Sequence, residues 1–316
     1  VINSNDHSLR SQLDIISSMA FRYLLLVLPA LVHARINVEV SGKFENENSD
    51  MKVHYSGSQM DIISDQERDS FSLGDNNLKN AVNAYFGRRP NDAFLKSPTP
   101  WGDLYRTYNW NQVARTLVPK SGKVLKITSQ PLIVMQQVFE NNSTKPATFN
   151  VGISHSVENR VSSHWAKSAE LSVEQEISYG IDIEVANLGG STTFSYTSAW
   201  GIGAEKSEAV TIGATSSMEV LLQPGQSVTT ELHATKGTIQ IEMEYLASLS
   251  GAVAVNYDDV YRGHHYWALP VQTVMSHGGL KNEIMSREII EIGFYSQSKV
   301  VVRDRKNSTK LMEVDF

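Results

Sequence analysis

The chain has 316 residues, of which 41% are hydrophobic, and its formal net charge at pH 7 is −6. This composition is typical of a folded protein and excludes a disordered or collagen-like chain. The mild acidity and the lack of Lys/Arg clusters argue against nucleic acid as a partner.

A short apolar run near the N-terminus has the features of a secretory signal peptide. A basic residue, Arg22, precedes it, and Val32-His33-Ala34 gives it a small-x-small-like end. The run is too short for a membrane span, and Pro29 disfavours the alternative of a buried helix. We expect residues 1–18 to be a non-native upstream leader, residues 19–34 a signal peptide and residues 35–316 the mature, secreted chain.

The chain contains no cysteine, so a secreted protein of this size must rely on packed sheets and not on disulfides. Secretion also makes three sequons candidate glycosylation sites, at Asn141, Asn142 and Asn307. The first two overlap, and we expect at most one of them to carry a glycan.

An amphipathic helix is predicted in the N-terminal third, ending at Gly87. Four apolar residues there share one helical face, with spacing i, i+4, i+7 and i+8: Leu78, Val82, Tyr85 and Phe86. The N-terminal region is therefore expected to be a smaller α+β domain over residues 35–122.

Four large aromatic residues crowd the segment that follows: Trp101, Tyr105, Tyr108 and Trp110. Such rings can form a surface platform for a receptor glycan or a lipid headgroup. A small aromatic core is the alternative, and the sequence leaves both open.

After Gly122, short apolar segments alternate with Gly, Pro and Asn turns, which is typical of antiparallel sheet proteins. Separate strands are predicted at 124–128 and 131–139, and the strand pattern continues to the C-terminus. Residues 123–316 are therefore predicted to be a β-rich module, and the fold class is mainly β.

The clearest pattern within this module lies between residues 165 and 204. From 171 to 185, odd positions are mostly apolar and even positions are Ser, Gly, Asp or Glu. A turn-prone segment from Asn187 to Ser191 separates this run from a second alternating run that ends near Ile202. A period of two indicates strands, so a long β-hairpin with one apolar and one polar face is predicted.

A strand that covers the core of a sandwich shows the same alternation, which leaves an ordinary sheet as the alternative. Length favours a hairpin that can enter a membrane. Globular strands usually have ~5–6 residues and tilted transmembrane strands need ~9–11, whereas the first alternating run alone spans 171–185 without Pro.

No catalytic motif stands out. The sequence has no Gly-x-Ser-x-Gly, no phosphate-binding Gly loop, no His-Glu-x-x-His and no cysteine nucleophile. His264 and His265 are adjacent and would point to opposite faces of a strand, so they are poorly placed to share a metal. The chain is expected not to be an enzyme and to use no cofactor or metal.

Two short runs carry a resemblance to a known family. Residues 85–93 read Tyr-Phe-Gly-Arg-Arg-Pro-Asn-Asp-Ala, and residues 96–105 read Lys-Ser-Pro-Thr-Pro-Trp-Gly-Asp-Leu-Tyr. Together with the signal peptide and the hairpin, they resemble the aerolysin-like β-pore-forming proteins of the epsilon-toxin/mosquitocidal-toxin branch. The similarity is greatest to secreted insect members such as follicular-epithelium yolk proteins and caterpillar venom toxins, and it covers most of 35–316.

The resemblance implies an elongated antiparallel β-sheet module in a soluble protein that binds membrane lipid or a glycosylated cell-surface receptor. It further implies a homo-oligomeric ring on the target-cell membrane and insertion of the 165–204 hairpin into a transmembrane barrel. The lipid face would then comprise Leu171, Val173, Ile177, Tyr179, Ile181, Ile183, Val185, Phe194, Tyr196, Trp200 and Ile202. The lumen face would comprise Glu174, Glu176, Asp182 and Glu184, and the tip Leu188, Gly189 and Gly190.

Two other functions remain possible at this stage. A non-lytic yolk, storage or eggshell protein could use the same fold, because a fold does not fix a function. No clear proteolytic activation site is present apart from Arg88-Arg89, which agrees with that alternative. A glycan-binding module is a third possibility, and it rests on the aromatic residues from Trp101 to Trp110.

Overall fold

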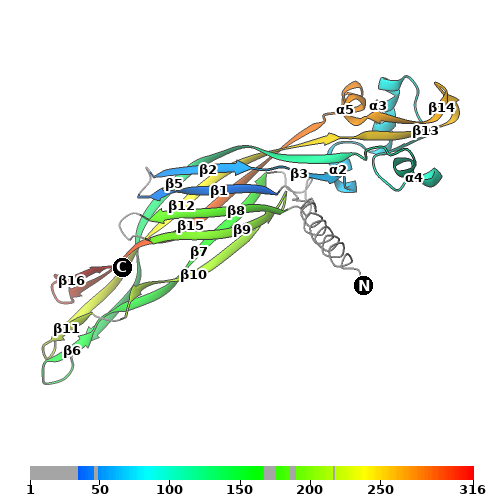
Figure 1. Ribbon diagram of the computed structural model, residues 1–316. Helices are drawn as coiled ribbons and strands as arrows, with labels where there is room; N and C mark the ends of the chain where they lie inside the picture. The colour runs from blue at the N-terminus through cyan, green and yellow to red at the C-terminus, as the bar shows by residue number, and fades with distance from the viewer. Residues whose placement is uncertain (1–34, 46–48, 167–175, 186–189, 216–217) are drawn as a thin grey trace, which may run out of the picture. The chain divides into compact units, whose positions relative to one another are not determined.

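The computed structural model describes residues 35–45, 49–166, 176–185, 190–215 and 218–316. Within these ranges the chain is built mainly from antiparallel β-strands in four sheets (Figure 1). The expected mainly β fold is therefore confirmed. The predicted leader and signal peptide lie outside the described residues.

The N-terminal elements are β1 (Ile36–Phe44), β2 (Asp50–Ser56), β3 (Gln59–Ile62), α2 (Asp65–Ser70), α3 (Asp75–Phe86), β4 (Asp92–Phe94) and α4 (Pro100–Thr107). The central strands are β5 (Ala114–Glu140), β6 (Ala147–Asn150), β7 (Ile153–Ala166), β8 (Glu176–Val185), β9 (Gly190–Ala199), β10 (Glu205–Ala214) and β11 (Glu219–Leu222). The C-terminal elements are β12 (Ser227–Ser250), β13 (Ala252–Tyr261), β14 (His264–Pro270), α5 (Val271–His277), β15 (Glu283–Asp304) and β16 (Lys310–Asp315).

The longest strands, β5, β12 and β15, lie next to one another in a seven-stranded sheet. Its order is β10-β7-β15-β12-β5-β3, and β16 pairs with β15. The two segments predicted at 124–128 and 131–139 are joined in β5, and the domain boundary expected near residue 122 falls inside that strand. Beyond Leu117, β12 is the only ladder partner of β5 among the described residues, so Pro119 and Pro131 can occupy β5 as an edge strand.

A second sheet has the order β2-β1-β8-β9 and contains the predicted hairpin. Its inward face and that of the long sheet share one hydrophobic core, with Val38 and Ile181 on one side and Ile292 and Phe294 on the other. Phe44 and Phe294 meet edge to face across the two sheets, with ring centroids 4.8 Å apart. The hairpin is thus part of one layer of a β-sandwich.

The helices gather at one end of the long strands, around a three-stranded sheet of order β14-β13-β4 (Figure 1). The predicted helix is confirmed as α3, with Leu78 and Val82 buried and Gly87 at φ 90° as its C-cap. Because β4 pairs with β13, this end combines N-terminal residues with residues 252–277, and not the N-terminal region alone. We call it the helical end.

A smaller core lies in the part of the fold that contains β6, β11 and β16. Val151 and Leu222 pack there with Val228, Leu232 and Val300. Among the described residues, none of the helices is both long and apolar enough to cross a membrane.

Candidate functional site

The predicted hairpin is formed by β8 and β9, which pair antiparallel from Glu176↔Ala199 to Val185↔Gly190. On its other side β8 pairs parallel with β1, from Ile36↔Ile177 to Phe44↔Val185. The outer edge of β9 has no ladder partner within the described ranges. The hairpin is therefore fixed along one edge by β1 and open along the other.

The two faces of the hairpin have opposite environments, as the alternation predicts. Residues Ile177, Tyr179, Ile181 and Ile183 of β8 are at most 2% exposed, and Tyr196 and Trp200 of the second run are at most 4% exposed. Glu176, Asp182 and Glu184 point outward and are exposed. Burial of each large apolar side chain contributes roughly 1.5–3 kcal/mol, so the inward face holds the hairpin firmly on the long sheet.

Several positions of the predicted membrane hairpin are not placed. Leu171, Val173, Glu174, Leu188 and Gly189 lie outside the described residues. Val185, Gly190 and Phe194 belong to β8 and β9, but their burial is not described. Ile202 follows the hairpin and is 45% exposed, unlike the six other residues of the predicted lipid face whose side chains the structure describes.

A polar cluster interrupts the otherwise apolar contact between the hairpin and the long sheet. The Tyr179 hydroxyl donates to Glu288 Oε2 on β15 and lies 2.9 Å from the Tyr245 hydroxyl on β12. The Ser198 hydroxyl donates to Glu288 Oε1 over 3.3 Å. The Tyr196 hydroxyl lies 2.9 Å from Ser163 Oγ on β7. Side chains of both hairpin strands thus bond to the long sheet.

Glu288 is the centre of this cluster and is 0% exposed. Burial raises its pKa from 4.5 to about 7, and the hydroxyl groups that donate to it oppose that shift. Burial, followed by the nearby Glu288 charge, also raises the pKa of Tyr179 well above 10. The carboxyl of Glu288 can therefore hold its proton at neutral pH.

The root of the hairpin has a second polar contact. Arg115 is fully buried, and its Nε donates to Glu67 Oε1 over 2.7 Å. Its guanidinium carbon lies 5.3 Å from the centre of the Trp200 ring, while the Trp200 indole donates to Ser286 Oγ over 2.8 Å. Trp200 is thus fixed at the point where the chain leaves β9.

The aromatic residues predicted as a receptor platform separate into two groups. Trp101 and Tyr108 are 45% and 48% exposed, and Trp110 stacks on Tyr108 with ring centroids 4.9 Å apart. Tyr105 is only 3% exposed, and its hydroxyl donates to the Phe94 and Ala252 carbonyls. Tyr105 therefore belongs to the small core that was the alternative, and the partly buried Trp110 packs against that core.

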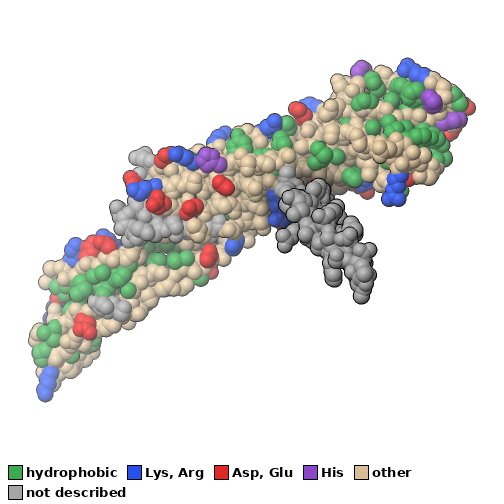
Figure 2. Space-filling view, viewed as in Figure 1, with side chains coloured by type: hydrophobic (Ala, Val, Ile, Leu, Met, Phe, Trp, Pro, Cys, Tyr) green, Lys and Arg blue, Asp and Glu red, His purple; other side chains and the backbone are tan. Residues whose placement is uncertain are grey.

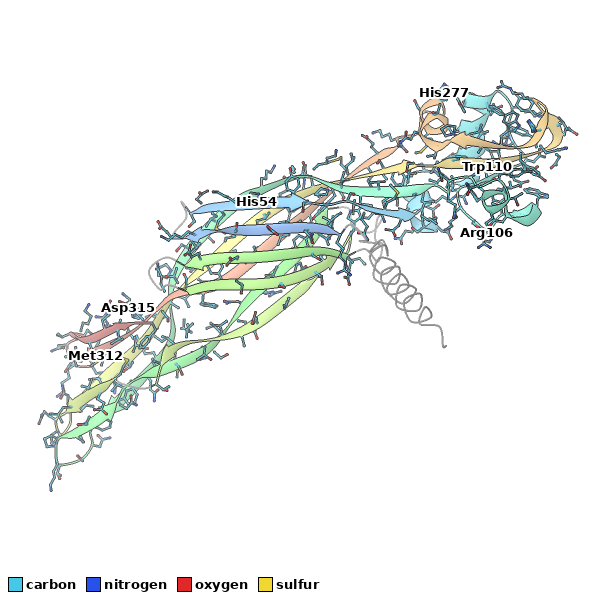
Figure 3. All side chains as sticks on the ribbon, in the orientation of Figure 1. His54, Arg106, Trp110, His277, Met312 and Asp315 are labelled. Atoms are coloured by element: carbon cyan, nitrogen blue, oxygen red, sulfur yellow. The ribbon has the colours of Figure 1, made fainter. Side chains whose placement is uncertain are left out.

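A further, partly buried ring lies next to the two exposed ones. Tyr266 of β14 lies 5.4 Å from Trp101 and 6.3 Å from Tyr108 between ring centroids. We call Trp101, Tyr108, Trp110 and Tyr266 the aromatic platform. Arg106 is beside it at the helical end, as Figure 3 shows, and hydrophobic side chains are frequent on this end in Figure 2.

The backbone under the platform is unusual. Trp101, Gly102 and Asp103 are consecutive residues with φ of 60°, 76° and 64°. This left-handed backbone is costly for residues other than glycine, and such conformations are concentrated at binding sites. Asp103 is held below the surface by Ser97 and Arg106, which fixes the loop that carries Trp101.

The three sequon asparagines have different surroundings. Asn141 is 2% exposed, and its side-chain amide donates to the Lys145 and Leu222 carbonyls over 2.9 and 2.8 Å. Asn142 and Asn307 are exposed. Of the overlapping pair, only Asn142 has a side chain that can carry a glycan on the folded protein.

Outside the hairpin and the aromatic platform, the described residues form no cluster of the predicted site residues. Within the described ranges, no group of three or more His, Asp or Glu side chains could hold a metal ion. His264 packs against Trp267, and His265 Nδ1 lies 2.8 Å from the Tyr257 carbonyl.

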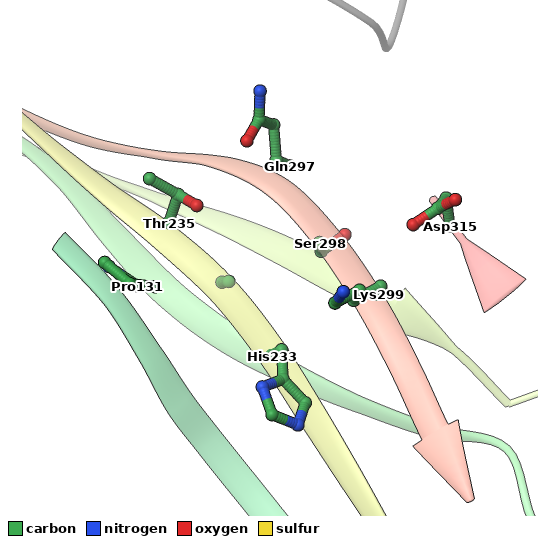
Figure 4. A pocket seen from close by; sticks show the side chains of 8 residues that line it. Pro131, His233, Thr235, Gln297, Ser298, Lys299 and Asp315 are labelled. Carbon is green, nitrogen blue, oxygen red and sulfur yellow. The ribbon is translucent and has the colours of Figure 1, made fainter. Parts of the chain in front are cut away.

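A pocket of about 500 Å³ opens where β12 and β15 change register, and Figure 4 shows its lining: Pro131, His233, Thr235, Gln297, Ser298, Lys299 and Asp315.

Glu288, Tyr245 and Tyr266 were not predicted from the sequence. Glu288 and Tyr245 lie 109 and 66 residues from Tyr179 along the chain, and no local pattern joins them. One signal was present: Ser286, Glu288, Ile290, Ile292 and Phe294 share one strand face, so Glu288 is a carboxylate among apolar positions. An ionisable residue at one of the apolar, inward-facing positions of a strand indicates a buried polar contact.

Comparison with solved structures identifies a protein of the same fold. Parasporin-2, a Bacillus thuringiensis toxin that recognizes cancer cells, aligns with a TM-score of 0.59 at 16% identity, over 78% of this chain and 98% of parasporin-2. This likeness shows a shared fold, and the mainly β, aerolysin-like fold expected from the sequence is confirmed.

Sequence comparison identifies the family. U-megalopygitoxin(8)-Mo12 of Megalopyge opercularis is 38% identical over 288 residues, covering 91% of this chain and 99% of that toxin. U-megalopygitoxin(8)-Mc8 of Megalopyge crispata is 37% identical over 289 residues, with the same two coverages. No protein-family model matches the chain. The chain belongs to the megalopygitoxin(8) family.

Proposed function

We propose that this protein is a secreted, non-enzymatic toxin that permeabilises target-cell membranes by inserting the β8–β9 hairpin into a transmembrane barrel. One observation supports it above all: the hairpin buries an apolar face and exposes an acidic one in a single layer of the sandwich. An apolar face that is covered in the soluble protein is the surface that a lipid-facing strand needs.

The dimensions of the hairpin suit a membrane. Strand β8 has 10 residues, and a tilted transmembrane strand needs ~9–11. Tyr179 and Tyr196 are cross-strand partners near the end of the hairpin that is remote from its tip. Rings at that level can form the aromatic girdle that marks a membrane interface, while Ile181 and Ile183 contact hydrocarbon.

Insertion requires several copies of the chain. A single hairpin would leave unpaired backbone groups in hydrocarbon, and a closed barrel is the arrangement that pairs them all. The outer edge of β9 has no partner strand among the described residues, and the edge of β8 becomes open when β1 separates, so neighbouring copies can pair through these two edges. The product is a homo-oligomeric ring whose lumen is lined by Glu176, Asp182 and Glu184.

The aromatic platform supplies attachment to the target cell. Exposed aromatic rings with an arginine beside them bind a sugar face of a glycosylated receptor or the headgroup region of a membrane. Trp101, Tyr108 and Arg106 are exposed at the helical end and are not part of the hairpin. Attachment and insertion therefore use different residues.

A reversible disulfide tests the proposal directly, because the chain contains no cysteine of its own. Ser163 Oγ on β7 and Ser198 Oγ on β9 are 3.4 Å apart, so cysteines at both positions can form a bond of about 2.05 Å after small shifts. We expect the oxidised S163C/S198C variant to release no dye from vesicles or red cells, and the reduced variant to release it.

The single variant Ser198→Cys is the matched control and should permeabilise membranes under both conditions. Equal dye release by the oxidised and reduced double variant would exclude hairpin insertion. Failure of the unmodified protein to release dye or to form oligomers on any target membrane would instead support a non-lytic role.

A further inference from the structure

Glu288 is an acid in a place where an apolar side chain would be expected. Its strand neighbours on the inward face are Ser286, Ile290 and Ile292; all three are buried, and the two isoleucines share one hydrophobic core with the apolar face of the hairpin. A buried carboxylate without a cation is costly, whereas a buried carboxylic acid with hydrogen-bond partners is tolerated. The cost of keeping Glu288 buried therefore depends on whether it holds its proton.

The groups that face Glu288 come from every element packed around it. Tyr179 on β8 and Ser198 on β9 belong to the hairpin, while Tyr245 on β12 and Ser163 on β7 belong to the long sheet. These groups are all hydroxyls. The charged residues next to it in the sheet point to the other face: Arg287 pairs there with Glu242 and Glu244, and His164 of β7 is exposed.

Movement of the hairpin separates these groups. Tyr179 and Ser198 would leave with β8 and β9, while Glu288 and Tyr245 would stay in β15 and β12. Glu288 would then be open to water, where its carboxylate is solvated at little cost. The docked and undocked hairpin therefore differ in how well they tolerate the charge on this one side chain.

We propose that Glu288 is a proton-controlled latch, which retains the hairpin on the long sheet while protonated and weakens that contact when it ionises. The inference rests on the proposed function for its biological meaning, because it concerns the release of the same hairpin. The dependence of hairpin docking on the protonation of Glu288 is a property of the protein in solution and can be measured without a membrane.

The direction of the pH dependence follows from the two states. Docking raises the pKa of Glu288 from 4.5 to about 7 through burial. Below pH 4.5 the group is neutral in both states, and docking is most stable. Between pH 4.5 and 7 only the undocked carboxyl ionises, so docking loses stability, and above pH 7 that loss is complete.

Amide hydrogen exchange in solution tests the latch. Protection factors for peptides from β8 and β9, corrected for the intrinsic pH dependence of exchange, should fall on the order of 50-fold between pH 5 and pH 7.5. In Glu288→Gln, which stays neutral, they should change less than threefold over the same range. Peptides from β13 serve as the internal reference for overall unfolding.

Glu242→Gln is the matched control. Glu242 is on the neighbouring strand β12 and is also buried, at 6% exposure, but it pairs with Lys123 and Arg287 on the opposite face of the sheet. This variant should keep the pH dependence of the unmodified hairpin. A Glu288→Gln protein with the same pH profile as the unmodified protein would overturn the proposal.

Tyr179→Phe provides the test if Glu288→Gln fails to fold. The Tyr179 hydroxyl stabilises the ionised form of Glu288, so its removal should shift the midpoint of the pH profile upward and reduce protection of the hairpin. A profile that superimposes on that of the unmodified protein would contradict the latch. Absence of dye release with an intact exchange profile would count against the pore function alone.

Discussion

Asn141 and Asn142 belong to overlapping sequons, yet folding gives their amides opposite roles. The Asn141 amide ties the turn after β5 to the end of β11 through the Leu222 carbonyl, and its oxygen accepts from the Ser143 backbone amide over 3.0 Å. A glycan on that nitrogen would remove a donor from a buried site. The adjacent side chain of Asn142 is exposed and has room for one.

Substitution of each asparagine by Gln should separate these roles. In protein secreted from a glycosylating host, Asn142→Gln should lose the mass of one glycan and change the free energy of unfolding by less than about 0.5 kcal/mol. Asn141→Gln should keep that glycan but lower the free energy of unfolding by roughly 1–3 kcal/mol, since the buried bond to the Leu222 carbonyl and the part-buried bond to the Lys145 carbonyl lose their donor. Intact mass and urea denaturation measure the two effects, and a glycan on Asn141 of the folded protein would contradict the assignment.

The hairpin shows what a local pattern can predict at the scale of an element. The period-two alternation placed Ile177, Tyr179, Ile181 and Ile183 on one face, and all four are buried. The pattern could not tell whether that face covers a protein core or meets lipid, because both environments select apolar side chains. In the soluble fold it covers a core, and the proposed pore would use the same face again.

Other elements depended on partners that are remote in sequence. Strand β5 continues through Pro119 and Pro131, where turns and breaks were predicted, because its unpaired edge tolerates a missing amide donor. Likewise, the helical end includes β13 and β14 only because β13 pairs with β4. The platform residue Tyr266 reaches Trp101 through that pairing, which no local spacing could indicate.

Reversal of charge on the outer face of β8 should change the ion selectivity of the proposed pore. Asp182 and Glu184 are exposed in the soluble protein, so Asp182→Lys/Glu184→Lys should fold normally and assemble. Acidic rings favour cations and basic rings favour anions. We expect the reversal potential in planar bilayers under a salt gradient to change sign.

Glu39→Lys is the control for this charge reversal. Glu39 is exposed on the same face of the same sheet, but it lies on β1 and is not part of the hairpin. Its substitution should leave the cation selectivity unaltered. Equal effects of the β1 and β8 variants would show that the face of β8 does not line the lumen.

At the scale of the whole molecule, the proposed function places cell attachment and membrane insertion on separate groups of residues. The aromatic platform is built from α4, the segment after it and β14, whereas the hairpin is docked by β1, β7, β12 and β15. The two groups share no side chain. Loss of one should therefore leave the other intact.

Removal of two platform rings should reduce attachment without altering the hairpin. For Trp101→Ala/Tyr266→Ala we expect at least about a tenfold weaker binding to target cells, equivalent to ~1.4 kcal/mol. Hydrogen exchange of β8 and β9 should stay unchanged. Tyr55→Ala is the control, because Tyr55 is 40% exposed on β2, outside the platform. Undiminished binding by the double variant would remove the platform from the attachment step.

The place of β15 in the chain has a consequence for biosynthesis. Both hairpin strands are complete at Ala199, but the strand that carries Glu288, Ile292 and Phe294 ends only at Asp304. At ~5–20 residues per second, a ribosome needs about 5–20 s to make the residues between them. During that interval the nascent chain has an amphipathic hairpin without its cover, and on the secretory route that we propose this hairpin is close to a membrane of the producing cell. Chaperone binding to this segment during synthesis would protect the producing cell.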